Sequence, residues 1–321
     1  MQYLKLAELY NKIENTSKRL EKTFIISEFL KECQKEELKK VLYLLQGRVF
    51  SQSDERKLGM SSKLLVKVIA QSTGEDTEKI EDEWRKEGDL GLVAEKLIDK
   101  KKQVTLFKKT LTLAKVFENI EKIAEMEGEG TVGRKVSMIS ELLSCASPVE
   151  AKYIIRTVAE ELRAGVGDSV LRDALVWAYY PKVVGIMFRC ENCKAVNPKT
   201  KNCLVCGEKI EDNFNKEIEK KFTSEFIIEE DEKKAREVYN QYLEELQNSF
   251  NITNDFGEIA EILKEKGRDG LLHLELAAGR PIKVMLYPKA KNIKEAFEIV
   301  GKPAVIEPKL DGFRMQSHRN K

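Results

Sequence analysis

A short run of charged residues close to the end of the sequence has the composition needed for nucleotidyl transfer. Lys309, Asp311, Gly312 and Arg314 form a Lys-x-Asp-Gly-x-Arg pattern, and Glu307 lies two positions before the lysine. A lysine amine attacks the α-phosphate of a nucleotide only when it is neutral. Nearby positive charge or desolvation must therefore lower its pKa from about 10.4. The pattern indicates Lys309 as a nucleophile, with Glu307 and Arg314 as contacts to the nucleotide.

The residues on either side of this pattern predict strands. Residues 304–306 are apolar, and Phe313, Met315 and Ser317 alternate after the motif. An alternative reading is an ordinary turn between two strands that carries surface charges, because motifs this short recur by chance.

Four cysteines form a second chemical group. Cys190 and Cys193 make one Cys-x-x-Cys pair, Cys203 and Cys206 make another, and nine residues separate the pairs. Such spacing can direct four thiolates at one tetrahedral ion, and four thiolates leave no open position for catalysis. We expect a structural Zn²⁺ in a small zinc-ribbon-like element. A redox pair and an iron–sulfur cluster are the alternatives.

The composition excludes a membrane protein and a polybasic tail. Among 321 residues, 42% are hydrophobic and 34% are charged, and the net charge is only +2. No apolar run approaches the length of about 18 residues that a membrane span needs, and the first residues do not form a signal peptide. We therefore expect a cytoplasmic protein with about two domains, in which any nucleic-acid surface is a local patch.

The elements that position these groups are predicted to be helices over most of the chain. Apolar residues recur at helical spacing from the first residues to about residue 280. Ser147, Pro148 and Glu150 have the order of a helix start, and the helix that they open is expected to end at Gly165. The sequence thus predicts a mainly α fold.

Two internal similarities suggest that a helical unit is duplicated. Residues 89–97 match residues 255–263 in Asp, Gly, Ala, Glu and Leu, and residues 59–60 match residues 165–166 more weakly. The matching residues are offset by 166 positions in the first match and by 106 positions in the second. The second copy therefore carries about 60 extra residues, which include the cysteines. We infer a duplicated unit with a zinc-binding insertion at about residues 186–235. Chance similarity between amphipathic helices is the alternative.

Glycines near helix starts are candidate phosphate contacts. Gly165 and Gly167 can leave backbone N–H groups free to bind an anion. Gly165 could instead be the C-cap of the preceding helix. The basic candidates for phosphate contacts are Arg134, Lys135, Arg156, Arg163 and Arg172.

The motif at Lys309, residues 279–285 and residues 162–167 together resemble the ATP-dependent DNA ligases of archaeal and eukaryotic type. The resemblance implies that Lys309 becomes adenylylated, that Glu307 and Arg314 contact AMP, and that ATP and Mg²⁺ are required. It also implies that such an enzyme seals nicks in double-stranded DNA during replication, repair and recombination. Residues 1–275 would form an all-α DNA-binding domain, in which Gly165 and Gly167 contact the minor-groove side of the nicked duplex.

A segment after a basic run resembles the sliding-clamp-binding segment of archaeal ligases. It contains Gln103, Leu106 and Phe107, although it lacks the usual paired aromatic residues. The alternative is an ordinary Leu-Phe core pair that opens the next helix.

Residues 276–321 resemble only the beginning of an adenylation (nucleotidyltransferase) domain. We therefore expect a fragment that is monomeric, competent to bind DNA and unable to form a lysyl-AMP adduct alone. A noncatalytic DNA-binding or clamp-binding module is the alternative. An RNA ligase or capping enzyme is a more distant one, because those enzymes share the Lys-x-Asp-Gly motif but not the helical region.

Overall fold

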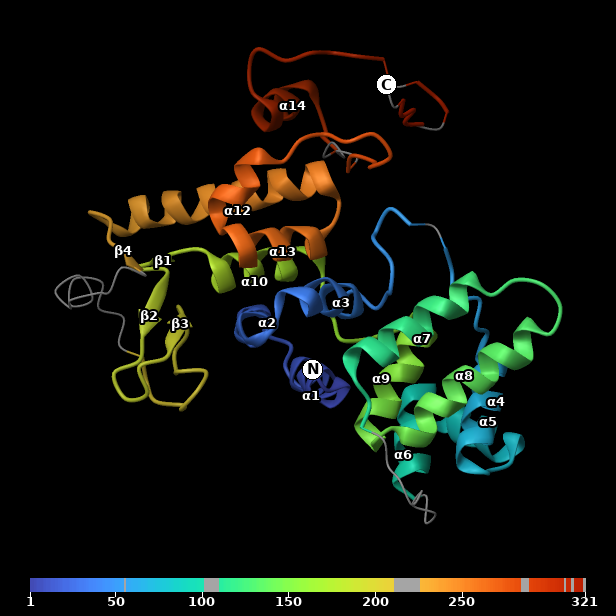
Figure 1. Cartoon of the computed structure of the whole chain (residues 1–321). Coiled ribbons are helices and arrows are strands. Elements are labelled where there is room, and N and C mark those ends of the chain that lie inside the picture. The colour runs from blue at the N-terminus through green and yellow to red at the C-terminus, as the bar shows by residue number, and fades with distance from the viewer. Residues whose placement is uncertain are drawn as a thin grey trace.

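The computed structural model describes residues 1–54, 56–100, 110–210, 226–283, 289–308, 310–312 and 315–319. The protein is mainly helical, as the sequence predicts (Figure 1). The helices before residue 100 are α1 (Tyr3–Glu14), α2 (Arg19–Glu32), α3 (Lys35–Leu45), α4 (Ser62–Thr73), α5 (Thr77–Glu87) and α6 (Leu90–Asp99). The later ones are α7 (Leu113–Glu125), α8 (Thr131–Cys145), α9 (Pro148–Val158), α10 (Asp168–Tyr179), α12 (Glu232–Thr253), α13 (Phe256–Lys266), the 3₁₀ helix η1 (Arg268–His273) and α14 (Ile293–Val300).

Helices from both halves of the chain build each of two lobes (Figure 1). In the first lobe α2 packs on α10 and α3 packs on α13, with α12 alongside. In the second lobe α4 packs on α8 and α6 packs on α9, with α5 alongside. Each lobe therefore combines early helices with late helices, and neither half of the chain could bury its apolar faces alone.

The starts of α1 and α7 meet between the lobes. The N–H of Tyr3 donates to the carbonyl of Leu111 over 2.9 Å, and the N–H of Leu113 donates to the carbonyl of Met1 over 3.0 Å. This reciprocal pair of hydrogen bonds joins the start of α1 to the start of α7.

Helices α6 and α13 start in the same way. Asp89 caps α6 by accepting from Gly91 N over 2.7 Å, and Asp255 caps α13 by accepting from Gly257 N over 2.8 Å. A Cβ atom on either glycine would lie under 3.0 Å from the helix packed against it, which is α9 for Gly91 and α3 for Gly257. These close approaches explain why both positions are glycine.

Helix α9 begins as predicted but ends earlier than predicted. Ser147 and Glu150 form the expected capping box, in which the N–H of Ser147 donates to Glu150 Oε2 over 2.7 Å. The helix ends at Val158 because Glu160 adopts a left-handed conformation with φ of 58°. Gly165 is therefore not the C-cap of α9, and it lies instead in the loop before α10.

Four short strands lie between α10 and α12 in the part of the chain that the structure describes. The strands β1 (Lys182–Val183) and β4 (Phe226–Ile227) pair in parallel, and β2 (Met187–Arg189) and β3 (Val196–Pro198) pair antiparallel. Cys190 and Cys193 lie in the connection between β2 and β3, and Cys203 and Cys206 lie in the loop that follows β3. In the first half of the chain, α4 and α5 are joined at the corresponding place by a short turn that contains Gly74.

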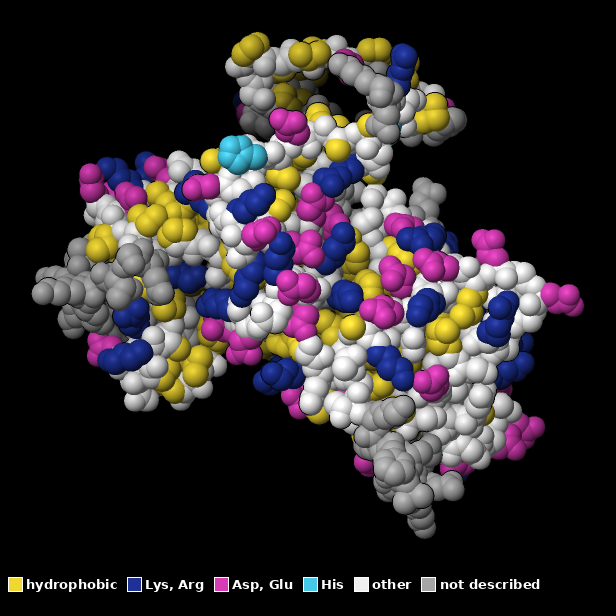
Figure 2. Space-filling model, viewed as in Figure 1, with side chains coloured by type: hydrophobic (Ala, Val, Ile, Leu, Met, Phe, Trp, Pro, Cys, Tyr) yellow, Lys and Arg dark blue, Asp and Glu magenta, His cyan; other side chains and the backbone are white. Residues whose placement is uncertain are grey.

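The segment around the Lys309 motif differs from the prediction. No strand forms among residues 289–308, 310–312 and 315–319, since an extended segment needs a neighbouring strand for its hydrogen bonds. Helix α14 has no buried residue, and Val305, Ile306, Leu310 and Met315 are largely exposed. Figure 2 shows hydrophobic side chains exposed at several places on the segment that lies apart from the helical lobes. Among the described residues, no helix combines the length and the apolar character that crossing a membrane requires.

Candidate nucleic-acid interface and metal site

The loop before α10 presents backbone donors to solvent. We call residues 164–167 the Gly165 loop. Gly165 has φ of 63° and is exposed, and Gly167 is the N-cap residue of α10. Within the described chain, the N–H groups of Gly165, Val166 and Gly167 donate to no protein acceptor. Three free donors at the positive end of a helix dipole form an environment that attracts an anion.

The loop before α4 repeats this arrangement. We call residues 58–61 the Gly59 loop. Gly59 has φ of 65° and lies three residues before α4, just as Gly165 lies three residues before α10. The N–H groups of Gly59, Met60 and Ser61 also donate to no acceptor in the described chain. The burial of the two loops matches residue by residue, with a buried residue followed by an exposed glycine.

A basic side chain accompanies each loop. Lys135 on α8 donates to the carbonyl of Leu58 over 3.0 Å, and Lys22 on α2 donates to the carbonyl of Ala164 over 2.8 Å. Neither lysine is paired with a carboxylate among the described residues, so both contribute uncompensated positive charge near the free donors. Lys135 was predicted to be a phosphate contact, whereas Lys22 was missed.

The other predicted arginines differ in their surroundings. Arg134 is exposed near the start of α8. Arg163 is 48% exposed and donates to the Gly88 carbonyl over 3.2 Å and to Glu161 over 2.7 Å. Arg172 is 22% exposed and is held by Asp173. These three arginines stay candidates for phosphate contacts.

Arg156 is not a phosphate contact in this structure, contrary to the prediction. Its side chain is 4% exposed and lies between two carboxylates. The guanidinium donates to both oxygens of Glu14 over 2.9 and 3.1 Å, and to Asp89 over 2.8 and 3.0 Å. Lys152 lies 3.0 Å from Glu14 in the same cluster. The cluster ties α1 and α6 to α9, so Arg156 has a structural role.

The ionisation of Glu14 reflects this cluster. Partial burial alone would raise the pKa of the carboxyl group, but hydrogen bonds from Arg156, Tyr153 and Lys152 favour the charged form and lower the pKa to about 2. The cluster therefore depends on Glu14 being ionised.

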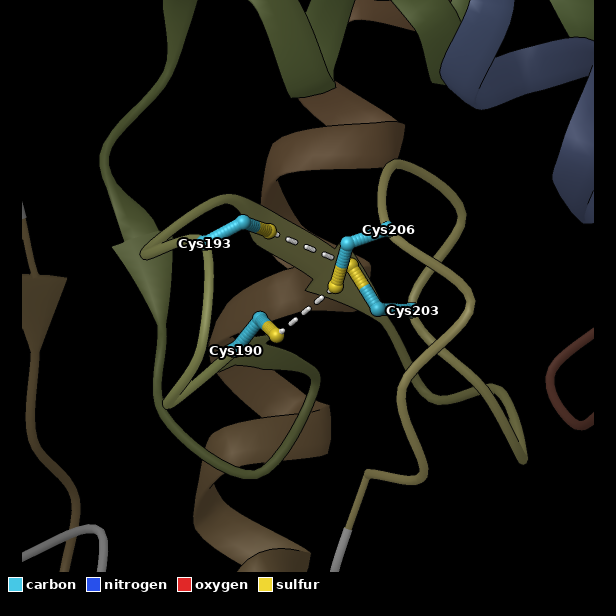
Figure 3. A group of neighbouring side chains, drawn as sticks. All are labelled: Cys190, Cys193, Cys203 and Cys206. Carbon is cyan, nitrogen blue, oxygen red and sulfur yellow. Dashed lines mark hydrogen bonds between the residues drawn. The ribbon is translucent and has the colours of Figure 1, made fainter.

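The four cysteines converge as the spacing predicts (Figure 3). Their sulfur atoms all lie within 4.8 Å of one another, and the distances from Cys190 Sγ to Cys206 Sγ and from Cys193 Sγ to Cys203 Sγ are both 3.5 Å. A disulfide would need about 2.05 Å. Tetrahedral zinc, with Zn–S of about 2.3 Å, places sulfurs about 3.8 Å apart. The donor set therefore fits a tetrahedral metal ion.

Two tight loops direct the thiols inward. The Cys190 carbonyl accepts from Lys194 N over 2.9 Å, and the Cys203 carbonyl accepts from Gly207 N over 2.9 Å. Lys194 and Gly207 both adopt positive φ, of 62° and 76°, which turns each loop back on itself. The two halves of the site are thus built alike.

Hydrogen bonds prepare one thiol for ionisation. Burial opposes the charged form of Cys203, but hydrogen bonds from the N–H groups of Cys206 and Val205 and from Asn197 lower its pKa to about 6. The amide of Asn197 is fully buried and donates to Cys203 Sγ over 3.3 Å. Such donors to sulfur stabilise a thiolate that is bound to a cation.

Several predicted residues cannot be placed. Lys309, Arg314, Gln103, Leu106 and Phe107 lie outside the described residues. Glu307 is exposed on the segment that lies apart from the helical lobes. The structure therefore does not test the nucleotide-binding and clamp-binding predictions.

Comparison with known proteins identifies the family to which the helical part of the chain is similar. Residues 2–176, more than half of the sequence, match the family described as DNA ligase N terminus. The chain belongs to this DNA ligase family. The match includes both glycine loops and both lysines that support them.

Archaeal DNA ligases are similar over nearly the whole chain. The DNA ligase of Nanoarchaeum equitans is 36% identical over 319 residues, which are 99% of this chain and 46% of that protein. The DNA ligase of Methanothermobacter thermautotrophicus is 35% identical over 317 residues, again 99% and 46%. That of Thermococcus onnurineus is 32% identical over 320 residues, 100% and 46%. The chain spans about half the length of the curated relatives that it matches.

The sequence of this ligase-family chain contained signals for the residues that were missed. Lys22 and Lys135 each lie ten residues before the last residue of their helix, and Gly59 and Gly165 each lie three residues before the next helix. Aligning the two halves by predicted helix ends, instead of by residue identity, would have paired Lys22 with Lys135, which was predicted.

Proposed function

We propose that this chain is the DNA-holding part of an ATP-dependent DNA ligase, which seals nicks in double-stranded DNA. The observation that carries the proposal is the pair of glycine loops, each with three free N–H groups and an adjacent lysine. Phosphate contacts of this kind position a protein on a duplex without reading its sequence. A ligase needs this property because nicks occur in any sequence.

The proposed chemistry of the whole ligase takes place at Lys309. The neutral amine attacks the α-phosphate of ATP, forms a lysyl-AMP bond and releases pyrophosphate. The AMP then passes to the 5′-phosphate at the nick. Finally the 3′-hydroxyl attacks that phosphate, which releases AMP and closes the strand. Mg²⁺ stabilises the charge on the phosphates, and Glu307 and Arg314 hold the nucleotide.

We propose that residues 1–275 form one DNA-binding domain of two duplicated helical units and that residues 276–321 begin an adenylation domain. The reciprocal packing of early and late helices and the two capping residues Asp89 and Asp255 support the duplication. The exposed apolar residues after 289 support a segment whose packing partners belong to another domain.

We propose that the four cysteines hold one structural Zn²⁺ in a zinc-ribbon-like insertion. The donor set supports zinc, because four convergent thiols with hydrogen bonds to sulfur suit a soft tetrahedral ion. The ion would stabilise a segment that is too small to build a core of its own.

Other partners of the ligase remain proposals based on the sequence. We propose that Gln103, Leu106 and Phe107 bind a sliding clamp and that the chain is a monomer. The alternative function, a noncatalytic DNA-binding or clamp-binding module, shares the glycine loops but makes no use of Lys309.

A binding experiment tests the proposed DNA function. Fluorescence anisotropy of the chain with a nicked duplex, an intact duplex and a single strand, measured over a range of salt concentrations, compares the three forms. We expect the tightest binding to the nicked duplex and a linear fall of log K with log salt concentration. Equal affinity for the duplexes and the single strand would contradict the proposal.

A further inference from the structure

We propose that Lys22 and Lys135 are positioning residues that hold the Gly165 and Gly59 loops from the opposite half of the chain, and thereby fix both loops in their DNA-binding conformation. The inference rests on the proposed DNA-binding function and adds the residues that prepare the loops for it.

The hydrogen bonds of the two lysines are equivalent. Lys22, on α2, donates to the carbonyl of Ala164, which is the residue before Gly165. Lys135, on α8, donates to the carbonyl of Leu58, which is the residue before Gly59. Both acceptor residues are buried, so each carbonyl needs a partner inside the protein. Both lysines are partly buried, and each makes the same bond to the residue before its glycine.

The glycines leave room for the lysines. A Cβ atom at Gly165 would lie only 2.8 Å from Lys22 Nζ, and a Cβ atom at Gly59 would lie 3.5 Å from Lys135 Nζ. The first distance is too short for van der Waals contact, whereas the second is ordinary. Alanine would strain the backbone at both positions because both glycines have positive φ, but only at position 165 would its Cβ atom also displace the lysine.

The exchange between halves gives the lysines a mechanical role. Lys22 lies on the early helix α2 and holds the Gly165 loop before the late helix α10. Lys135 lies on the late helix α8 and holds the Gly59 loop before the early helix α4. Each hydrogen bond therefore crosses the interface between the halves. Each loop leads into a helix that packs on the helix carrying its lysine, α10 on α2 and α4 on α8, so each lysine fixes its loop to the lobe that contains both helices.

Lys22→Met and Lys135→Met test the role in DNA binding, since methionine keeps the apolar stem and removes the donor. Loss of one hydrogen bond from a charged group is expected to weaken binding to the nicked duplex about tenfold. Lys22→Arg should restore most of the affinity. Lys79→Met is the matched control, because Lys79 is exposed on α5 near the end of α4 that is opposite Gly59. It should bind like the wild-type protein.

The salt dependence separates positioning from direct contact. A lysine that only positions its loop leaves the slope of log K against log salt concentration unchanged, whereas loss of a direct phosphate contact lowers the slope by about 0.9. A reduced slope in Lys22→Met and Lys135→Met would overturn the positioning role. Unchanged affinity with a lower melting temperature would overturn it too, because the lysines would then be merely structural.

Double variants test whether each lysine acts through its loop. Gly165→Ala displaces Lys22, so adding Lys22→Met to it should weaken binding no further. Gly59→Ala leaves room for Lys135, so adding Lys135→Met to it should weaken binding about tenfold again. Full additivity in the first pair would contradict the inference.

A measurement without DNA keeps this inference separate from the proposed function. Amide hydrogen exchange of the free chain should accelerate in Lys22→Met at Val170 and Leu171, which donate to the Gly167 carbonyl. In Lys135→Met it should accelerate at Leu64 and Leu65, which donate to the Ser61 carbonyl, and in Lys79→Met at neither pair. If the wild-type chain failed to prefer nicked duplex while these amides accelerated, the proposed function would fail and the positioning role would stand. Unchanged exchange at both pairs of amides would overturn the positioning role.

Discussion

Replacing Arg156 with methionine should destabilise the protein without lowering its affinity for DNA. The variant keeps the apolar stem but leaves two carboxylates near α9 without their guanidinium partner. Asp89 is 5% exposed and retains only its capping hydrogen bonds and Arg163 at 3.5 Å, whereas Glu14 retains Lys152 and Tyr153.

The structure sets the size of the effect. Removing one partner of a buried ion pair costs about 3–5 kcal/mol. The contacts that the carboxylates retain place Arg156→Met near the lower value. At about 2–4 °C per kcal/mol for a domain of this size, the melting temperature should fall by about 6–12 °C.

Thermal unfolding followed by circular dichroism measures this fall, and anisotropy well below the transition measures DNA affinity. We expect affinity within about twofold of the wild-type value, or about 0.4 kcal/mol. Arg85→Met is the control, because its ion pairs with Glu81 and Asp82 are local and exposed and should contribute about 1 kcal/mol or less. An Arg156→Met variant with unchanged melting temperature and weaker DNA binding would refute the structural role.

Three further predictions follow from other parts of the structure. Hydrogen bonds lower the pKa of Glu14 to about 2 from an ordinary 4.5, so its ionised form stabilises the fold above about pH 5, and this stability is lost as the pH falls toward 2. The melting temperature of Glu14→Gln should therefore depend less on pH between about 5 and about 2. A dependence identical to that of the wild-type protein would exclude the Arg156 cluster as the source of the pH dependence. Native mass spectrometry should detect one zinc per chain, absent in Cys203→Ser, which should also melt at lower temperature; a full complement of zinc in that variant would contradict the four-thiolate site. Tyr43→Phe removes the 2.6 Å hydrogen bond to the capping residue Asp255 and should lower the free energy of unfolding in urea by about 1–2 kcal/mol. This loss is smaller than the loss expected for Arg156→Met, which removes an ion pair from the capping residue Asp89. Equal losses would contradict the ionic account of the Arg156 cluster.

Local signals in the sequence predicted local structure well. Ser147 and Glu150 form their capping box, and the four cysteines converge. In each case a few neighbouring residues determine the geometry, through a hydrogen bond to an adjacent N–H group or through the geometry of a tight loop.

The failures concern contacts between distant parts of the chain. Arg156 has the type and position of a phosphate contact, but α1 and α6 bury it through residues 142 and 67 positions away. The role of Lys22 likewise depends on a carbonyl 142 residues later. The strands expected around the Lys309 motif depend on partner strands, which a propensity pattern cannot supply. Packing that is not encoded by a local pattern decided each of these outcomes.

Hydrogen exchange of the full chain with and without nicked duplex tests most directly the claim that both glycine loops hold DNA. We predict that the duplex slows amide exchange at residues 59–61 and at residues 165–167 together, and that both effects weaken as salt is added. Slowed exchange at only one loop, or elsewhere with neither loop affected, would contradict the account.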